Sequence, residues 1–241
     1  MLRVGLQTLV RLVYPPRCLV CGGLVETDLG LCGTCWRETP FISGLRCDLC
    51  GVPLPGESDD AEHCDDCLAT PRPWAQGRAA LVYRDTGRRL VLMLKHGDRH
   101  DIAEAAGLWM ARGARSMMQD GMIAVPVPLH LRRHLSRRFN QSALLARSLA
   151  DALGLDWSSE ALARVRHTQS LEGRGRAERF ETLREAIAPG REAAALHGRP
   201  VLLVDDVMTS GATLAVASEA CLAAGASSVC VMVLARAAKD A

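Results

Sequence analysis

The chain has 241 residues, 49% hydrophobic and 23% charged, which is enough for one well-buried α/β domain and a small satellite module. Its formal net charge of +2 gives no overall basicity that would indicate a nucleic-acid partner. No transmembrane segment is visible, and Arg3, Gln7 and Arg11 interrupt the first apolar stretch, which argues against a signal peptide. We therefore predict a cytoplasmic protein without membrane insertion, whose thiols stay reduced.

The first predicted element is an N-terminal helix within residues 1–17, ended by Pro15 and Pro16. Its apolar positions form one helical stripe, made of Leu2, Leu6, Leu9, Val10 and Val13. The stripe is short and weakly charged, which favours packing on the protein itself over anchoring in a membrane.

Residues 18–70 form a predicted cysteine-rich module, because eight of the 10 cysteines occur there as four C-x-x-C pairs. The segment has few large apolar residues, so it needs a bound metal ion to stabilise its fold. Consecutive pairs predict two tetrahedral four-cysteine sites for structural Zn2+. The ligands are Cys18, Cys21, Cys32 and Cys35 for one site and Cys47, Cys50, Cys64 and Cys67 for the other. Spacing alone also permits crossed pairing, and iron–sulfur ligation is the competing chemistry.

Pro71-Arg72-Pro73 is interpreted as a linker to a larger domain over residues 75–241. Apolar runs predict strands at 79–83, 122–127, 201–204 and 229–234. Apolar periodicity predicts helices at 100–118, 139–153 and 213–224. The last strand, helix and strand form a βαβ unit, so we predict an α/β domain with a parallel sheet flanked by helices.

The segment 201–213 carries the clearest chemical signal: a buried strand, two adjacent acids, a hydroxyl-rich loop and a helix. Ligands of open α/β sheets bind beyond the carboxyl ends of the strands, and successive N–H groups at a helix N-terminus bind anions. Acids beside a phosphate are reasonable if they accept hydrogen bonds from the vicinal hydroxyls of a ribose. The candidate binding residues are Asp205, Asp206, Val207, Met208, Thr209, Ser210, Gly211, Ala212 and Thr213.

The alternative for the acids is an ordinary helix start. As ligand-site acids, Asp205 and Asp206 are expected to be solvated and to make few internal contacts.

Three basic segments are further candidates. Arg132, Arg133 and Arg138 lie at a predicted strand-to-helix turn, where arginine is suited to bidentate phosphate binding, although a solvated charged turn is the alternative. The stretch 164–184 is typical of a loop that closes over substrate, and an exposed helix is nearly as good an interpretation. Lys95, in the segment 95–99, is a candidate substrate-binding residue or part of a plain turn.

Val201–Thr213 resembles the phosphoribosyl-pyrophosphate signature of type I phosphoribosyltransferases. The resemblance implies that the paired acids bind the ribose hydroxyls and the loop binds the 5′-phosphate. It also implies that Mg2+ accompanies the ligand, and that Arg132, Arg133 and Arg138 stabilise the departing pyrophosphate as catalytic residues.

The order of parts resembles the ComF family of competence-associated proteins. It consists of a double zinc ribbon, Leu94–Arg99, the stretch Arg137-Arg138-Phe139-Asn140-Gln141 and the Asp-Asp loop. That family usually has glycine where this chain has Arg138. The resemblance implies a type I phosphoribosyltransferase-like fold and a role in DNA uptake during natural transformation.

Three functions follow as hypotheses. The first is a phosphoribosyltransferase, a pentosyl-transferring enzyme whose acceptor no segment identifies. The second is a sensor that binds phosphoribosyl pyrophosphate or a nucleotide without turnover. The third is a partner of single-stranded DNA or of DNA-uptake proteins, against which the low aromatic content of 4% counts, because stacking platforms need aromatic rings.

Overall fold

The computed structural model describes residues 14–96, 99–129, 140–165 and 186–238. Its centre is a five-stranded sheet in the order β1-β7-β6-β2-β3, in which every neighbouring pair is parallel. The strands are β1 (Gln76–Val82), β2 (Ile123–Pro126), β3 (Asp156–Trp157), β6 (Pro200–Met208) and β7 (Ser228–Arg236). A small antiparallel pair, β4 (Leu162–Arg164) and β5 (Ile187–Pro189), lies beside it.

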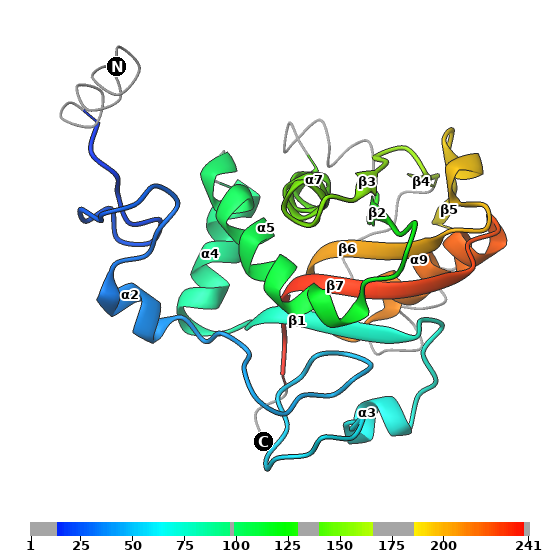
Figure 1. Ribbon diagram of the computed structural model, residues 1–241, viewed down its shortest axis with the longest axis horizontal. Helices are drawn as coiled ribbons and strands as arrows, with labels where there is room; N and C mark the ends of the chain where they lie inside the picture. Colours follow the sequence, from blue (N-terminus) through cyan, green and yellow to red (C-terminus); the bar gives the residue numbers. More distant parts are fainter. Residues whose placement is uncertain (1–13, 97–98, 130–139, 166–185, 239–241) are drawn as a thin grey trace.

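Helices cover both faces of this sheet (Figure 1). One face carries α4 (Asp85–His96), α5 (His100–Ala114) with the short η1 (Arg115–Met117), and α7 (Gln141–Leu153), whereas α9 (Ala212–Ala223) lies on the other. The short η2 (Ala193–Leu196) precedes β6. The predicted α/β class, with a parallel sheet flanked by helices, is confirmed.

Two cores form because side chains of a strand alternate between the faces. In β6, Leu202 and Val204 pack under α4, α5 and α7, while Val201 and Leu203 pack against the α9 side. All four side chains are fully buried. This double burial explains why the sequence shows an unbroken apolar run here rather than an alternating one.

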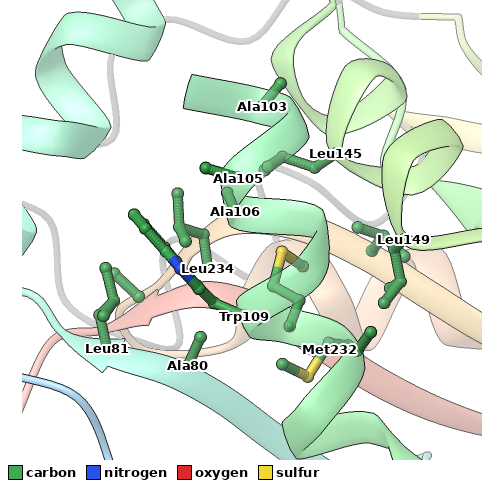
Figure 2. Close-up of a cluster of buried hydrophobic side chains, with 14 of the residues drawn as sticks. Ala80, Leu81, Ala103, Ala105, Ala106, Trp109, Leu145, Leu149, Met232 and Leu234 are labelled. Carbon is green, nitrogen blue, oxygen red and sulfur yellow. The ribbon is translucent and has the colours of Figure 1, made fainter. Parts of the chain in front are cut away.

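The α5 helix lies close to both the sheet and α7. Figure 2 shows Trp109 lying across the sheet toward Leu81 and Leu234, with Leu145 facing α5 from α7. At Gly107, an added Cβ would be 2.5 Å from the Cβ of Ser148 on α7. This position therefore requires glycine, because any side chain would push the two helices apart.

The cysteine-rich segment divides over the two faces. Cys18 and Cys35, with α2 (Gly33–Glu38), belong to the core under α4 and α5. Cys47 and Cys67, with α3 (Asp65–Leu68), belong to the core shared with α9. The domain boundaries at 17, 70 and 75 remain predictions, since both cores extend across the last of them.

Most predicted elements occur close to their predicted positions, but α4 was missed. Gly87, Arg88 and Arg89 hide the helical pattern of its first turns. The predicted end of α7 is confirmed, since Gly154 adopts a left-handed φ of 68° as its C-cap.

Candidate functional site

The two acids lie near the carboxyl end of β6, where three elements meet. The Oγ of Ser142, in α7, donates to Oδ1 of Asp205 at 2.7 Å, and the backbone N–H of Asp206 donates to the same oxygen at 2.8 Å. Nζ of Lys95, in α4, is 3.1 Å from Oδ1 of Asp206. The structure thus brings Lys95, a separate candidate in the sequence, into contact with the acid pair.

The expectation that these acids are solvated with few internal contacts is wrong. The side chain of Asp206 is 14% exposed and that of Lys95 20%. Burial and the neighbouring charge of Asp206 raise the pKa of Asp205 to about 7, against the opposing effects of Ser142, the Asp206 N–H and Lys95. The site therefore contains a carboxyl whose pKa lies near neutral pH and a cation that partly compensates the charge of the pair.

Asn140 and Gln141 contact the residues that bind the acid pair. Asn140 caps α7 by accepting from the N–H of Ser142 at 3.0 Å, and its Nδ2 donates to the carbonyl of Val127 at 3.2 Å. Gln141, which is 1% exposed, donates to the carbonyl of Lys95 at 3.5 Å. Ser142 was missed by the sequence reasoning, although its position next to Asn140-Gln141 was a usable signal.

After the acids, Val207 and Met208 complete β6. Val207 pairs with Ala235 of β7, and the Met208 side chain is buried in the core, so from Met208 only backbone groups remain for a ligand. Thr209 is exposed, whereas Ser210 and Thr213 are half-buried.

Gly211 opens α9 as its N-cap, with a left-handed φ of 80°. The N–H of Ala212 reaches Ser210 Oγ at 3.4 Å, and the N–H of Ala215 donates to the Gly211 carbonyl at 2.9 Å. The loop from Thr209 to Thr213 therefore leads directly into a helix N-terminus, an arrangement that favours anions.

Two buried arginines that the sequence analysis missed hold the loop carbonyls. Arg236, at the end of β7 and 5% exposed, donates through Nη1 to the carbonyls of Met208 at 3.2 Å and Thr209 at 2.8 Å. Arg72, whose side chain is 3% exposed, donates through Nη1 to the Ser210 carbonyl at 3.0 Å. The segment Pro71-Arg72-Pro73, interpreted as a linker, therefore also supplies a side chain that binds the loop.

Arg132, Arg133 and Arg138 lie in the segment 130–139, outside the described residues, as does the basic stretch 166–184. The flanks of the first segment are described. The N–H of Val127 donates to the carbonyl of Val204 at 2.9 Å, and Asn140 binds the carbonyl of Val127. The described residues Val127 and Asn140, on either side of the segment, therefore lie near the end of β6 that carries the acids.

The eight clustered cysteines form two tetrads, Cys18-Cys21-Cys32-Cys35 and Cys47-Cys50-Cys64-Cys67, whose sulfurs lie within 4.8 Å of one another. Cys21 and Cys32 sulfurs are 3.7 Å apart, as are those of Cys50 and Cys64. A tetrahedral zinc with Zn–S bonds of about 2.3 Å requires sulfurs about 3.8 Å apart. The tetrads fit zinc, and pairing of consecutive C-x-x-C motifs is confirmed.

Backbone groups prepare the first tetrad for metal binding. Burial acts to raise the pKa of the Cys18 thiol, but hydrogen bonds from the backbone of Cys21, Cys32 and Val20 outweigh it and lower the pKa to about 6. Zinc binds thiolate rather than thiol, so the backbone around Cys18 favours its ligating form, whereas burial and then hydrogen bonds with neighbouring cysteines raise the pKa of the Cys35 thiol.

These features define a class of protein: a double zinc ribbon joined to a parallel α/β sheet that carries an acid pair and a hydroxyl-rich loop at a helix N-terminus. The family of double zinc ribbon domains matches residues 9–68. Among the described residues, no helix has both the length and the apolarity to cross a membrane.

Relatives match along nearly the whole chain. DNA utilization protein YhgH of Salmonella typhimurium is 34% identical over 232 residues, which is 93% of this chain and 99% of that protein. Competence protein F of Haemophilus influenzae is 30% identical, over 92% and 97%. Competence protein ComFC of Bacillus subtilis is 28% identical, over 84% and 82%. The chain therefore belongs to the ComF family.

Solved structures with a related fold include a glutamine phosphoribosylpyrophosphate amidotransferase from Bacillus subtilis. Its TM-score is 0.40 at 18% identity, and the match covers 59% of this chain but only 30% of that enzyme. A hypoxanthine-guanine phosphoribosyltransferase of Leishmania donovani has a TM-score of 0.33 at 20% identity, over 56% and 71%. The predicted parallel sheet flanked by helices and the N-terminal double zinc ribbon are confirmed.

Proposed function

We propose that the site at the end of β6 binds 5-phosphoribosyl 1-pyrophosphate. Asp205 and Asp206 accept hydrogen bonds from the ribose hydroxyls, and the loop from Thr209 to Thr213 binds the 5′-phosphate. The observation that carries this proposal is the placement of two adjacent acids near the carboxyl end of a central strand, followed by a short loop and by a glycine that opens the 12-residue helix α9. Open α/β sheets bind ligands at this end of their strands.

Lys95 gives the site a cation that the ligand can recruit. In the ligand-free protein its ammonium lies beside Asp206. A pyrophosphate brings several negative charges, which Lys95, Arg132 and Arg133 are suited to pair with. Mg2+ belongs to the proposal as the hard cation that binds phosphate oxygens with few protein ligands.

The reaction we propose is phosphoribosyl transfer. The bond from the ribose C1 to the pyrophosphate oxygen breaks, a bond from C1 to an acceptor nucleophile forms, and pyrophosphate leaves with both electrons of the broken bond. Arg132, Arg133 and Arg138 would stabilise the charge that develops on this leaving group. A sensor that only binds the ligand would use the same contacts without bond breaking.

Calorimetry with phosphoribosyl pyrophosphate and Mg2+, followed by a turnover assay with the labelled compound and a panel of bases and amines, tests the proposal. We expect saturable binding, and release of pyrophosphate with one class of acceptor. Binding without turnover across the panel would favour the sensor, and no binding would reject the proposal.

Since zinc ligation needs reduced thiols, we also propose a cytoplasmic location.

Replacing both Arg132 and Arg133 with alanine should weaken binding of phosphoribosyl pyrophosphate by roughly 100- to 10,000-fold, because each replacement removes a charge-assisted hydrogen bond. Binding of ribose 5-phosphate, which lacks the pyrophosphate, should hardly change. Arg191→Ala is the matched control, since that side chain is 82% exposed and pairs with Glu160. Equal losses for both ligands would contradict the assignment of these arginines to the pyrophosphate.

A second candidate function, binding of single-stranded DNA, rests on an aromatic pocket of about 350 Å³ beside the first ribbon. Trp36, 45% exposed, lies with its ring centroid 4.5 Å from that of Phe41, and Phe41 meets Trp109 edge-on at 5.4 Å. Arg46 and Arg112 also line the pocket. Aromatic faces beside arginines suit unpaired bases and their phosphates, and the low aromatic content counts less against DNA once three rings lie together.

Trp36→Ala should weaken binding of a fluorescent single-stranded oligonucleotide by about 5- to 100-fold, as expected for the loss of one stacked base. Trp157→Ala is the control, because that tryptophan is 38% exposed on β3 and does not line the pocket. Fluorescence anisotropy measures both variants. If Trp36→Ala and Trp157→Ala lose the same affinity for the oligonucleotide, or if neither variant loses affinity, the pocket is not a DNA site.

A further inference from the structure

Arg72 connects the second cysteine tetrad to the phosphate loop. Its Nη2 lies 3.6 Å from Oδ2 of Asp66, the residue before the zinc ligand Cys67. Its Nη1 donates to the carbonyl of Ser210 at 3.0 Å, across 138 residues of sequence. One buried guanidinium therefore contacts both the metal ribbon and the candidate ligand site.

On the ribbon side, Arg72 packs on Trp74, which is itself hydrogen-bonded to the ribbon. The Arg72 guanidinium lies over the ring of Trp74, 5.4 Å from its centroid, and the indole N–H of Trp74 donates to the carbonyl of Leu49, between two zinc ligands, at 2.7 Å. An added Cβ at Gly51 would be 2.6 Å from the backbone N of Ala79 in β1. The position of Arg72 thus depends on a ribbon that packs backbone against backbone on the sheet.

The loop end of the connection determines which way a peptide faces. In a trans peptide the N–H points opposite to the C=O. Since the carbonyl of Ser210 is turned toward Arg72, the N–H of Gly211 is turned away from it. Arg236 acts in the same way on the carbonyl of Thr209 and so on the N–H of Ser210.

The glycine at the loop fits this arrangement. An added Cβ at Gly211 would be 2.9 Å from Nη1 of Arg72, and the φ of 80° is strained for any other residue. Within the described residues, Nε and Nη2 of Arg72 have no hydrogen-bond acceptor. Asp66 and the Cys67 sulfur face the positive charge of Arg72 on the ribbon side, while its Nη1 binds the Ser210 carbonyl on the loop side.

We propose that Arg72 is a positioning residue through which the second zinc ribbon sets the affinity of the loop for a phosphate monoester. Zinc at Cys47, Cys50, Cys64 and Cys67 holds the ribbon, the ribbon holds Arg72, and Arg72 orients the Gly211 N–H. The phosphate part rests on the proposed function, whereas the link from ribbon to loop does not.

The link is tested without ligand by hydrogen exchange of the Ala215 amide, which donates to the Gly211 carbonyl at 2.9 Å. At a temperature well below the melting transition of every variant compared, the freed Ser210–Gly211 peptide of zinc-loaded Arg72→Met should let this amide exchange about tenfold faster or more, as expected for one lost charged hydrogen bond. Affinity for ribose 5-phosphate should fall by a similar factor. Arg191→Met should change neither, and both variants should keep their zinc.

Removing each metal separately then tests the coupling. Cys64→Ser should lose the second zinc, speed exchange at Ala215 and weaken ribose 5-phosphate binding, and it should add little of either effect in an Arg72→Met background. Cys21→Ser, which should lose the first zinc, is the matched control and should leave Ala215 protected.

The proposal would be overturned if the Ala215 amide of Arg72→Met exchanged at the rate of the parent protein. It would also be overturned if the effects of Cys64→Ser and Arg72→Met on exchange and affinity added up in the double variant. A parent protein that does not bind ribose 5-phosphate would reject the proposed function instead, and the exchange result would still decide the role of Arg72. If Arg72→Met loses zinc, Arg72→Lys serves in its place. It keeps the charge and the apolar stem but not the forked donor, and the same faster exchange is expected of it.

Discussion

Removal of both zinc ions is expected to unfold the cysteine-rich segment and to destabilise the sheet domain with it. A structural four-cysteine zinc contributes about 10–16 kcal/mol, which is as large as the whole folding free energy of a typical domain, about 5–15 kcal/mol. Cys18 and Cys35 belong to one main core and Cys47, Cys50 and Cys67 to the other. Loss of metal therefore removes support from both faces of the sheet.

Metal analysis of protein purified without chelator should find close to two zinc equivalents, because two tetrads fit the metal. Cys47→Ser should lower this number to one and cause a large drop in the melting temperature. Cys221→Ser is the matched control, since Cys221 is buried in α9 but belongs to neither tetrad, and it should keep both zincs. Finding iron, or no bound metal, would show that the tetrads have another purpose.

Asp206→Asn should weaken binding of ribose 5-phosphate and of phosphoribosyl pyrophosphate by about 10- to 100-fold, since a hydrogen bond to a charged acceptor is worth about 1.5–3 kcal/mol. The amide keeps the shape of the side chain but replaces one acceptor oxygen with a donor. Calorimetry measures the loss. Normal binding by a variant that melts much lower without ligand would mean that the acid is structural.

The contact with Lys95 requires a control for stability. Asp206→Asn leaves the Lys95 ammonium without its partner, which costs a buried cation several kcal/mol, but Lys95 is 20% exposed and its stem can carry the charge to water. We expect a loss of only about 1 kcal/mol. The double variant with Lys95→Met should regain stability without regaining ribose binding, and recovery of both would contradict the ribose assignment.

The pH dependence of unfolding gives an independent check on the pair. Burial first, and the charge of Asp206 second, raise the pKa of Asp205 from 3.8 to about 7 in the folded protein. The stability linked to this raised pKa is fully present below pH 3.8 and is lost as the pH rises toward 7. Asp206→Asn removes the second cause and lowers the folded pKa, so the variant should lose less stability than the parent over this window. Parallel melting curves against pH would exclude the coupling.

The sequence by itself determined the features whose chemistry is contiguous. The four C-x-x-C pairs from Cys18 to Cys67 predicted two zinc sites, because the segment needs bound metal to fold, but the structure was needed to decide between consecutive and crossed pairing. The strand, the acid pair and the loop around Gly211 are likewise consecutive residues, and a buried strand followed by a helix restricts them to one arrangement.

Only the tertiary structure decided which distant side chains complete the site. Ser142 reaches Asp205 across 63 residues and Arg72 reaches Ser210 across 138, and no local pattern distinguishes either from an ordinary helix serine or a linker arginine. Asp205 and Asp206 looked solvated in the sequence, yet α4 and α7 enclose them with Lys95 and Ser142. Periodicity predicts which face of a helix is buried, but packing across the sheet edge selects the polar partners, because a buried polar group must find its hydrogen bonds wherever the chain brings a donor.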